Sequence, residues 1–248
     1  MAAAPVLDYL RDPARIYAES LAIIRAEAKL AGLSPPIAAM AERLIHASGM
    51  TDIVADLRFD PSVAASVAAA LATGAPILTD CEMALKAISP VKLPAANELV
   101  CLLNDPRVPG LARRLATTRS AAAVTLWPER LDNAVAVIGN APTALFALIE
   151  GLDRGWPKPA AIIAFPVGFV GAAEAKQELA RDSRGVPFIT LLGRRGGSAM
   201  AGAAVNAITH GAPALTSLMA GPRAGHPEHV AEKELDGRVK PGHEGRGK

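Results

Sequence analysis

The sequence contains few of the residues that commonly catalyse reactions or bind metals. Only five histidines, two cysteines and two tryptophans occur in 248 residues. Cys81 and Cys101 lack CxxC spacing, which excludes a disulfide framework and a zinc knuckle. The motifs GxGxxG, GxxxxGK[ST] and GxSxG are absent, so the fingerprints of dinucleotide binding, P-loops and nucleophile elbows are missing as well.

The sequence also lacks a large charge of either sign and a membrane-spanning run. The 26 basic and 24 acidic residues leave a net charge of +2, and no long basic run occurs, so we expect no nucleic-acid partner. Gly, Pro, Asn and His interrupt the uncharged stretches 61–79 and 196–222, and the N-terminus has no positively charged signal region. We therefore expect a cytoplasmic protein without membrane contact.

Apolar residues are abundant, and their pattern predicts the fold class. A hydrophobic content of 51% excludes disorder for most of the length, and 248 residues suffice for one large domain. Short apolar runs that suit buried strands alternate with helical patterns; the runs are 76–79, 98–103, 134–138, 160–165 and 187–192. This pattern is typical of a parallel sheet covered on both faces. We predict a three-layer α/β/α sandwich around a mainly parallel sheet of about five strands.

Caps and composition define the boundaries of the predicted domain. Cap residues followed by proline predict helices over residues 12–31, 34–49 and 60–74. The chain from 211 to 248 is rich in charged residues, Gly and Pro and has no apolar periodicity. We therefore predict one domain over residues 1–210 and a disordered tail over 211–248, with no metal site at the two tail histidines of the string HPEH.

The residues that follow the predicted strands are candidates for ligand binding. Open α/β sheets bind ligands at the carboxyl ends of their strands. Asp80 follows the first run, and Asn140 follows the third, so both are candidate binding residues. The turns beginning at Gly139 and Pro166 lead into helices, whose N-termini can expose N–H groups to an anion. Each turn alone suits an ordinary helix cap, but together they favour an anion-binding crevice.

His46 is the clearest candidate for proton transfer, because it is the only histidine before residue 210. Arg43 precedes it by three residues and shares its helix face. An Arg beside a His suits a site that binds a carboxylate and moves a proton. Spacing alone slightly favours a simpler alternative, in which the helix dipole stabilises His46 and Arg43 faces solvent.

Two further residues have simple structural explanations. Ser20 is predicted on the buried side of the first helix, with Ile16, Ile23 and Ile24, where a hydrogen bond back to the Ile16 carbonyl would satisfy its hydroxyl. Arg119 falls between two helical patterns, where a surface arginine would be unremarkable. Neither residue identifies a site by its spacing.

Several strings of the sequence, in a fixed order, resemble a known family. They are IYAESLAIIRAE (16–27), RLIHASG (43–49), GAPILTD (74–80), TRSAAA (118–123), GNAPTALF (139–146), PVGFVGAAE (166–174) and GRRGGSAM (193–200). With them the chain resembles the precorrin-8X methylmutases over roughly residues 6–209. The tail beyond residue 210 has no counterpart in this resemblance.

The resemblance implies an isomerase that shifts a methyl group from C11 to C12 of a carboxylated tetrapyrrole, giving hydrogenobyrinate. It implies that no redox cofactor, metal or S-adenosylmethionine is consumed. His46 would be the proton donor and acceptor, and Ser20, Arg43 and Arg119 would contact substrate. The family is homodimeric, so the resemblance also implies a second copy, with the site close to the subunit boundary.

Three other functions remain open at this stage. One is the cobalt-precorrin-8 methylmutase reaction, which no residue separates from the metal-free reaction because the metal would arrive inside the substrate. Another is a tetrapyrrole carrier without catalysis, which would not need His46 as a proton donor. The third is a nucleotide-binding α/β protein, which only an analogy of fold supports.

Overall fold

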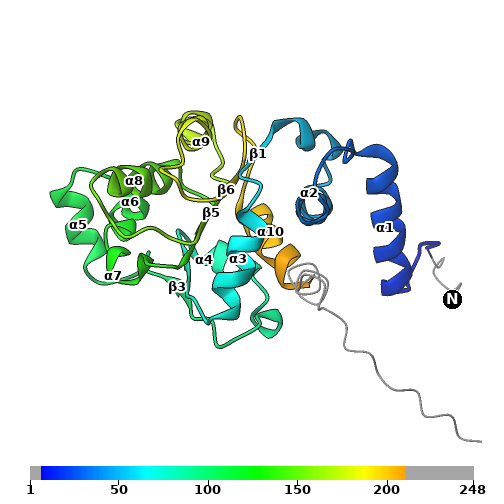
Figure 1. Cartoon of the computed structure of the whole chain (residues 1–248), viewed down its shortest axis with the longest axis horizontal. Helices are drawn as coiled ribbons and strands as arrows, with labels where there is room; N and C mark the ends of the chain where they lie inside the picture. Colours follow the sequence, from blue (N-terminus) through cyan, green and yellow to red (C-terminus); the bar gives the residue numbers. More distant parts are fainter. Residues whose placement is uncertain (1–6, 211–248) are drawn as a thin grey trace, which may run out of the picture.

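A computed structural model describes residues 7–210 of the chain (Figure 1). The predicted tail at 211–248 and its histidines lie outside the described residues. Six strands form one sheet in the order β1-β6-β5-β4-β2-β3. Their bounds are β1 Leu57–Phe59, β2 Ile77–Thr79, β3 Leu99–Cys101, β4 Val135–Ile138, β5 Ala161–Ala164 and β6 Phe188–Leu191.

The five predicted strands all form, and they pair in parallel with one another. The sixth strand, β1, was not predicted, because Arg58 interrupts its apolar residues and no continuous apolar run forms. It pairs antiparallel with β6, with Leu57 opposite Leu191. β1 therefore adds an edge strand of opposite direction to the expected parallel sheet.

The helices fall into two groups according to whether the sequence predicts them. Three follow the caps named above: α1 Pro13–Glu27, α2 Pro35–Ser48 and α3 Val63–Ala72. Three others match helical patterns that the sequence shows at 142–154, 172–181 and 198–209: α8 Pro142–Asp153, α9 Ala172–Arg181 and α10 Ser198–His210. Shorter helices fill the connections: α4 Glu82–Ala87, α5 Val108–Arg114, α6 Arg119–Val124 and α7 Pro128–Leu131, with the 3₁₀ turns η1 Thr51–Asp56 and η2 Pro90–Lys92.

The caps explain where the first two helices begin and end. The Asp12 side chain accepts a hydrogen bond from the Arg15 amide at 2.7 Å, which starts α1. Gly49 ends α2 in the left-handed conformation, with φ of 69°, and its amide donates to the Ile45 carbonyl. α2 therefore stops as predicted, whereas α1 ends at Glu27, four residues before its predicted end.

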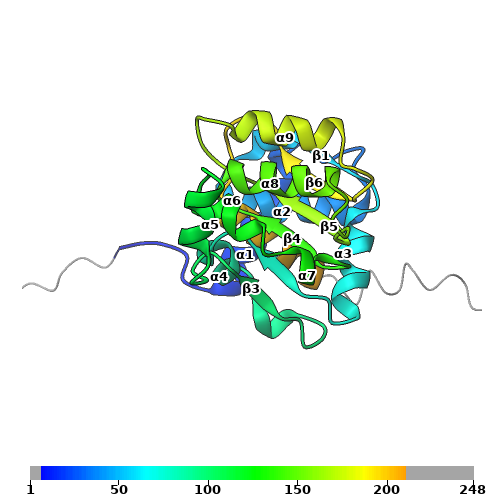
Figure 2. The same ribbon diagram turned by 90° about the vertical axis from the view of Figure 1, so that its left-hand side faces the viewer.

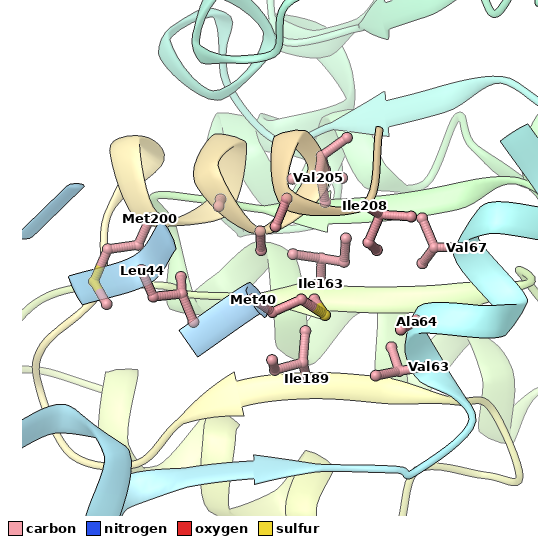
Figure 3. Packing of buried hydrophobic residues seen from close by; sticks show 14 of the residues in the cluster. Met40, Leu44, Val63, Ala64, Val67, Ile163, Ile189, Met200, Val205 and Ile208 are labelled. Atoms are coloured by element: carbon pink, nitrogen blue, oxygen red, sulfur yellow. The ribbon is translucent and has the colours of Figure 1, made fainter. Parts of the chain in front are cut away.

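Alternate strand residues pack on opposite faces of the sheet, which produces the three layers. On one face α2, α3 and α10 cover residues such as Ile163 and Ile189 (Figure 3). On the other face α8 and α9 cover residues such as Ala136 and Ile162, and Figure 2 shows these two helices in front of the strands. The predicted single-domain α/β/α sandwich is thus confirmed.

α1 is the exception to this layered packing. It lies beyond α2 at the margin of the molecule (Figure 1), and Ile24 is its only buried residue. Within residues 7–210 no helix is long and apolar enough to cross a membrane.

The carboxyl ends of the five parallel strands define one edge of the sheet, here called the carboxyl edge. β1 runs in the opposite direction and therefore begins at this edge, where Leu57 pairs with the last residue of β6. Since η1 directly precedes β1, the chain that follows α2 also reaches the carboxyl edge.

Candidate active site

His46 and Ser20 are joined by a hydrogen bond between two helices. His46 lies in the last turn of α2, and its Nδ1 is 2.9 Å from the Ser20 hydroxyl of α1. The Ser20 hydroxyl therefore bonds to His46, and the predicted bond to the Ile16 carbonyl is not what the structure shows. With Nδ1 engaged, Nε2 is the ring nitrogen through which His46 could exchange a proton.

Tyr17 connects His46 to Arg43, and sequence reasoning did not identify it. The rings of Tyr17 and His46 meet edge to face, with centroids 5.6 Å apart. The Arg43 guanidinium carbon lies 5.1 Å from the centroid of the Tyr17 ring. Tyr17 precedes Ser20 by one helical turn, and this spacing was the only signal that could have indicated it.

His46 borders an open cleft between α1 and the end of α2. The cleft has a volume of about 440 Å³ and is lined by Leu10, Ile16, Glu19, Ser20, Ile23, Ile24, Glu27, Ile45, His46, Gly49 and Thr51. Ile16 and Ile23 are 45% and 49% exposed. The prediction that they lie on a buried side of α1 is therefore wrong for a single chain, because no other element of the described chain covers this wall.

Asp80 holds the turn that follows β4. Its side chain is 1% exposed, and its two carboxylate oxygens accept hydrogen bonds from the amides of Gly139, Asn140 and Ala141 at 2.7, 3.1 and 2.8 Å. Burial raises the pKa of the Asp80 carboxyl, and the three backbone hydrogen bonds oppose that rise.

These contacts bear on two expectations about the carboxyl edge. Asp80 is buried and its carboxylate accepts from three backbone amides, so in this structure it holds a turn, and the substrate contact expected of it stays a prediction. The N–H groups of residues 139–141 are already occupied by Asp80, so they are not available to an external anion. Asn140 is half-buried beside this turn, with its amide held by Asp80 and its carbonyl by the Val167 amide.

Arg119 lies at the β3 end of the carboxyl edge, away from β1 and η1. It is the first residue of α6, a short helix that was not predicted, and it does not lie between helices as expected. Its guanidinium donates to the Leu103 carbonyl at 3.2 Å and to the Asn104 side chain at 2.9 Å. Asn104 and the turn after β3 therefore fix the direction of an exposed guanidinium.

The structure brings Ser20, Arg43 and His46 together and separates Arg119 from them. α2 packs on the face of the sheet that α3 and α10 also cover, whereas α6 packs against α8 on the opposite face (Figure 1). η1, which follows the helix of His46, leads into β1, whereas Arg119 contacts the turn after β3. Six strands at a spacing of about 4.8 Å place β1 and β3 about 24 Å apart. One chain therefore carries these candidate residues in two separate groups, here called the candidate half-sites, on opposite faces of the sheet and toward opposite ends of its carboxyl edge.

The residues described offer neither a metal centre nor an activated thiol. No group of three or more His, Cys, Asp or Glu side chains in residues 7–210 could hold a metal ion. Burial raises the pKa of both the Cys81 and the Cys101 thiol, which opposes formation of a thiolate. Cys81 lies in contact with Ser198, 3.3 Å from its hydroxyl.

Comparison with known proteins gives a consistent result. The precorrin-8X methylmutase family profile matches residues 15–210. The chain is 57% identical over 203 residues to a precorrin-8X methylmutase of Pseudomonas aeruginosa, covering 82% of this chain and 98% of the relative. It is 36% identical over 213 residues to a cobalt-precorrin-8 methylmutase of Salmonella typhimurium, covering 82% of this chain and 98% of that relative. The crystal structure of a precorrin-8X methylmutase from Thermus thermophilus superposes with a TM-score of 0.71 at 39% identity, covering 80% of this chain and 96% of that one.

Proposed function

The chain belongs to the precorrin-8X methylmutase family, isomerases of cobalamin biosynthesis, and from this we propose that it converts precorrin-8X to hydrogenobyrinate by moving a methyl group from C11 to C12 of the ring. The observation that carries the proposal is the pairing of His46 with Ser20 at 2.9 Å, at the border of an open cleft.

His46 would act as the proton donor and acceptor. Protonation of a ring atom near C11 makes the conjugated system electron-poor, so that it can accept the migrating methyl group. After the shift the same imidazole takes the proton back. Substrate and product therefore contain the same atoms, as an isomerisation requires. One general acid contributes about 10²–10⁴-fold, so rigid binding of the ring must supply the rest.

Ser20 and Tyr17 would hold the imidazole in position for this transfer. The Ser20 hydroxyl hydrogen-bonds Nδ1 in either neutral tautomer and so orients the ring, and the Tyr17 ring limits rotation of the imidazole plane. Arg43, stacked on Tyr17, would bind a substrate carboxylate close to the reacting ring. Ser20 can also contact the substrate, because it lines the cleft together with His46.

Substrate carboxylates would also meet residues at the other half-site. Arg119 is exposed and directed by Asn104, which suits a charged hydrogen bond to an acetate or propionate group. Asn140 would contribute a further polar contact, while Asp80 would act indirectly by holding the turn 139–141.

We further propose that the chain works as a homodimer. The half-site with His46 and the half-site with Arg119 are separated by the width of the sheet, so one macrocycle would be contacted by both only if a second copy brings its Arg119 near. The exposed apolar wall of α1, with Ile16 and Ile23, is a surface that such a copy could cover.

Two alternatives are distinguished by experiment. Relatives include enzymes of both the metal-free and the cobalt-containing reaction, but the higher identity, 57% against 36%, favours the metal-free substrate. Turnover of precorrin-8X and of cobalt-precorrin-8 by the purified protein should be compared directly. A tetrapyrrole carrier would bind ligand without turnover and would not depend on His46.

The deciding experiment is an absorbance titration with hydrogenobyrinate of wild-type protein and of His46→Ala. We expect a perturbed ligand spectrum and tight binding in both, with turnover of precorrin-8X in the wild type alone. Normal turnover by His46→Ala would contradict the acid role. An unchanged spectrum in both proteins would remove the tetrapyrrole assignment.

A further inference from the structure

Two neighbouring loops at the carboxyl edge present an exposed aromatic ring and an unpaired guanidinium. The loop after β5 carries Phe169 and Val170, which are 86% and 88% exposed. The loop after β6 carries Arg194, whose guanidinium carbon lies 5.2 Å from the centre of the Phe169 ring. Exposure of adjacent large apolar side chains costs solvation free energy, so it indicates a surface that is covered during function.

The backbone around these side chains is firmly held. The Gly168 amide donates to the Arg194 carbonyl at 3.1 Å, and the Gly197 amide donates to the Phe165 carbonyl at 2.7 Å. A Cβ at Gly196 would lie 2.4 Å from the Phe165 carbonyl oxygen, so only glycine permits this approach of the two loops. The exposure of Phe169 is therefore fixed by the fold around it.

The same loops are connected to the His46 cleft. The Arg195 guanidinium pairs with Asp52 at 2.7 Å and with Asp56 at 3.0 Å, both on η1. The residue before Asp52, Thr51, lines the cleft together with His46. Phe169 and Arg194 therefore lie on the side of the carboxyl edge that leads to the proton-transfer site.

The charges in and beside the cleft show where a carboxylated ligand would find a cation. Of the described residues that line the cleft, two are glutamates and none is Arg or Lys. A polycarboxylate entering this cleft therefore needs cations from beside it. Arg195 is neutralised by its two aspartates, whereas no carboxylate of residues 7–210 lies within ion-pair distance of Arg194.

We propose, resting on the function proposed above, that Phe169 and Arg194 form a recognition surface for the substrate macrocycle. The Phe169 ring packs on the flat conjugated face, and the Arg194 guanidinium binds a carboxylate at the rim of the same macrocycle. The pair determines specificity for a carboxylated tetrapyrrole and takes no part in proton transfer.

The test is a hydrogenobyrinate titration of Phe169→Ala, Phe169→Leu, Arg194→Ala and Arg194→Lys beside the wild type. Loss of one charged hydrogen bond should weaken the Kd roughly 10- to 100-fold in Arg194→Ala. Arg194→Lys and Phe169→Leu should retain part of the affinity. Two matched controls should bind like the wild type: Arg154→Ala removes a guanidinium 5.5 Å from the Trp156 ring, and Val91→Ala removes an apolar side chain that is 88% exposed.

The outcomes separate this proposal from the function on which it rests. Wild-type binding with unchanged affinity in Phe169→Ala and Arg194→Ala would overturn the recognition surface alone, whereas a wild type that fails to bind overturns the assigned function with it. The oligomeric state of each variant is measured by sedimentation without ligand. Weaker binding that accompanies dissociation into single chains would identify Phe169 as a subunit contact and overturn the proposal.

Discussion

At the residue scale, the neighbours of His46 determine which of its nitrogens faces a substrate. The Ser20 hydroxyl is hydrogen-bonded to Nδ1, and the Tyr17 and His46 rings pack edge to face. Because a hydroxyl can donate to Nδ1 or accept from it, this hydrogen bond persists when Nε2 gains or loses a proton.

Replacing Ser20 by Ala should therefore reduce turnover without abolishing it. The hydrogen bond that orients the imidazole is worth about 1 kcal/mol, so we expect kcat to fall roughly fivefold. Steady-state kinetics with precorrin-8X measures this change, and hydrogenobyrinate titration measures any loss of substrate contact separately. Ser48→Ala is the matched control, because the Ser48 hydroxyl contacts neither α1 nor His46. It donates to the Leu44 and Ile45 carbonyls of α2 and accepts from the Met50 amide just after the helix. An unchanged kcat in Ser20→Ala would show that Tyr17 and the helix alone orient His46.

The sequence predicts the members of this half-site better than it predicts their contacts. Ser20, Arg43 and His46 were identified from the resemblance, and the structure brings them together. Tyr17 was missed because its contacts with His46 and Arg43 cross from α1 to α2, and no spacing within one helix encodes that approach. The sequence also did not indicate that Asp80 holds the turn 139–141, since its burial depends on strands far apart in the chain.

At the scale of elements, buried charges tie the loops of the carboxyl edge together. Asp80 connects the end of β2 to the turn after β4. Lys176 of α9 is fully buried, and its ammonium donates to the Arg195 carbonyl at 2.6 Å, in the loop after β6. Burial lowers the pKa of Lys176 from 10.5 to about 8, and the charge of Arg195 contributes to that decrease.

The lowered pKa predicts how stability changes with pH. Between about pH 8 and pH 10.5 the unfolded chain keeps a proton on Lys176 that the folded chain has released. The free energy of unfolding should therefore rise with pH in this window, by about 3 kcal/mol from this residue. Urea denaturation at several pH values should show that Lys176→Met lacks this rise relative to the wild type.

Lys158→Met is the matched control for this experiment. Its ammonium also donates to a loop carbonyl, that of Arg184 at 2.6 Å, but Lys158 is exposed. The pH dependence of this variant should follow the wild type. A Lys176→Met protein with the same slope as the wild type would contradict the assignment of the slope to a buried ammonium.

Elements with a clear apolar pattern were predictable, and those without one were not. Five strands were found because each is a continuous apolar run, as burial on both faces demands. β1 has Arg58 between its two apolar residues and so lacks a continuous run, and α6, with six residues, is too short for a helical period. Pairing with β6 forms β1, and the cap at Thr118, whose side chain accepts from the Ala121 amide, begins α6. A tertiary contact therefore decided β1, whereas a local cap decided where α6 begins.

At the scale of the whole molecule, the two half-sites lie at opposite ends of one sheet edge. This arrangement could not be predicted from the sequence, because the order β1-β6-β5-β4-β2-β3 separates segments that patterns alone leave unplaced. In a symmetric dimer each surface patch is used twice, so the His46 end of one copy can meet the Arg119 end of the other in two equivalent sites.

Mixing two impaired variants tests whether such sites are shared. His46→Ala lacks the proton donor, and Arg119→Ala should bind substrate about 1.5–3 kcal/mol more weakly. After dissociation and random reassociation, half of the dimers contain one copy of each variant, and each of these has one intact site. Measured well below the Kd of Arg119→Ala, activity should recover to about a quarter of the wild-type value.

The matched control is the mixture of His46→Ala with Arg43→Ala. Both changes lie in the same half-site, the one with His46, so each His46 half-site of a mixed dimer carries one of the two changes. The mixed dimer therefore contains no intact site, and its activity should stay low. Sedimentation of the wild type should give twice the mass of the chain and confirm that mixed dimers form. Mixed dimers of His46→Ala and Arg119→Ala that stay inactive would contradict the shared site, because an active site built within one chain cannot be restored by its partner.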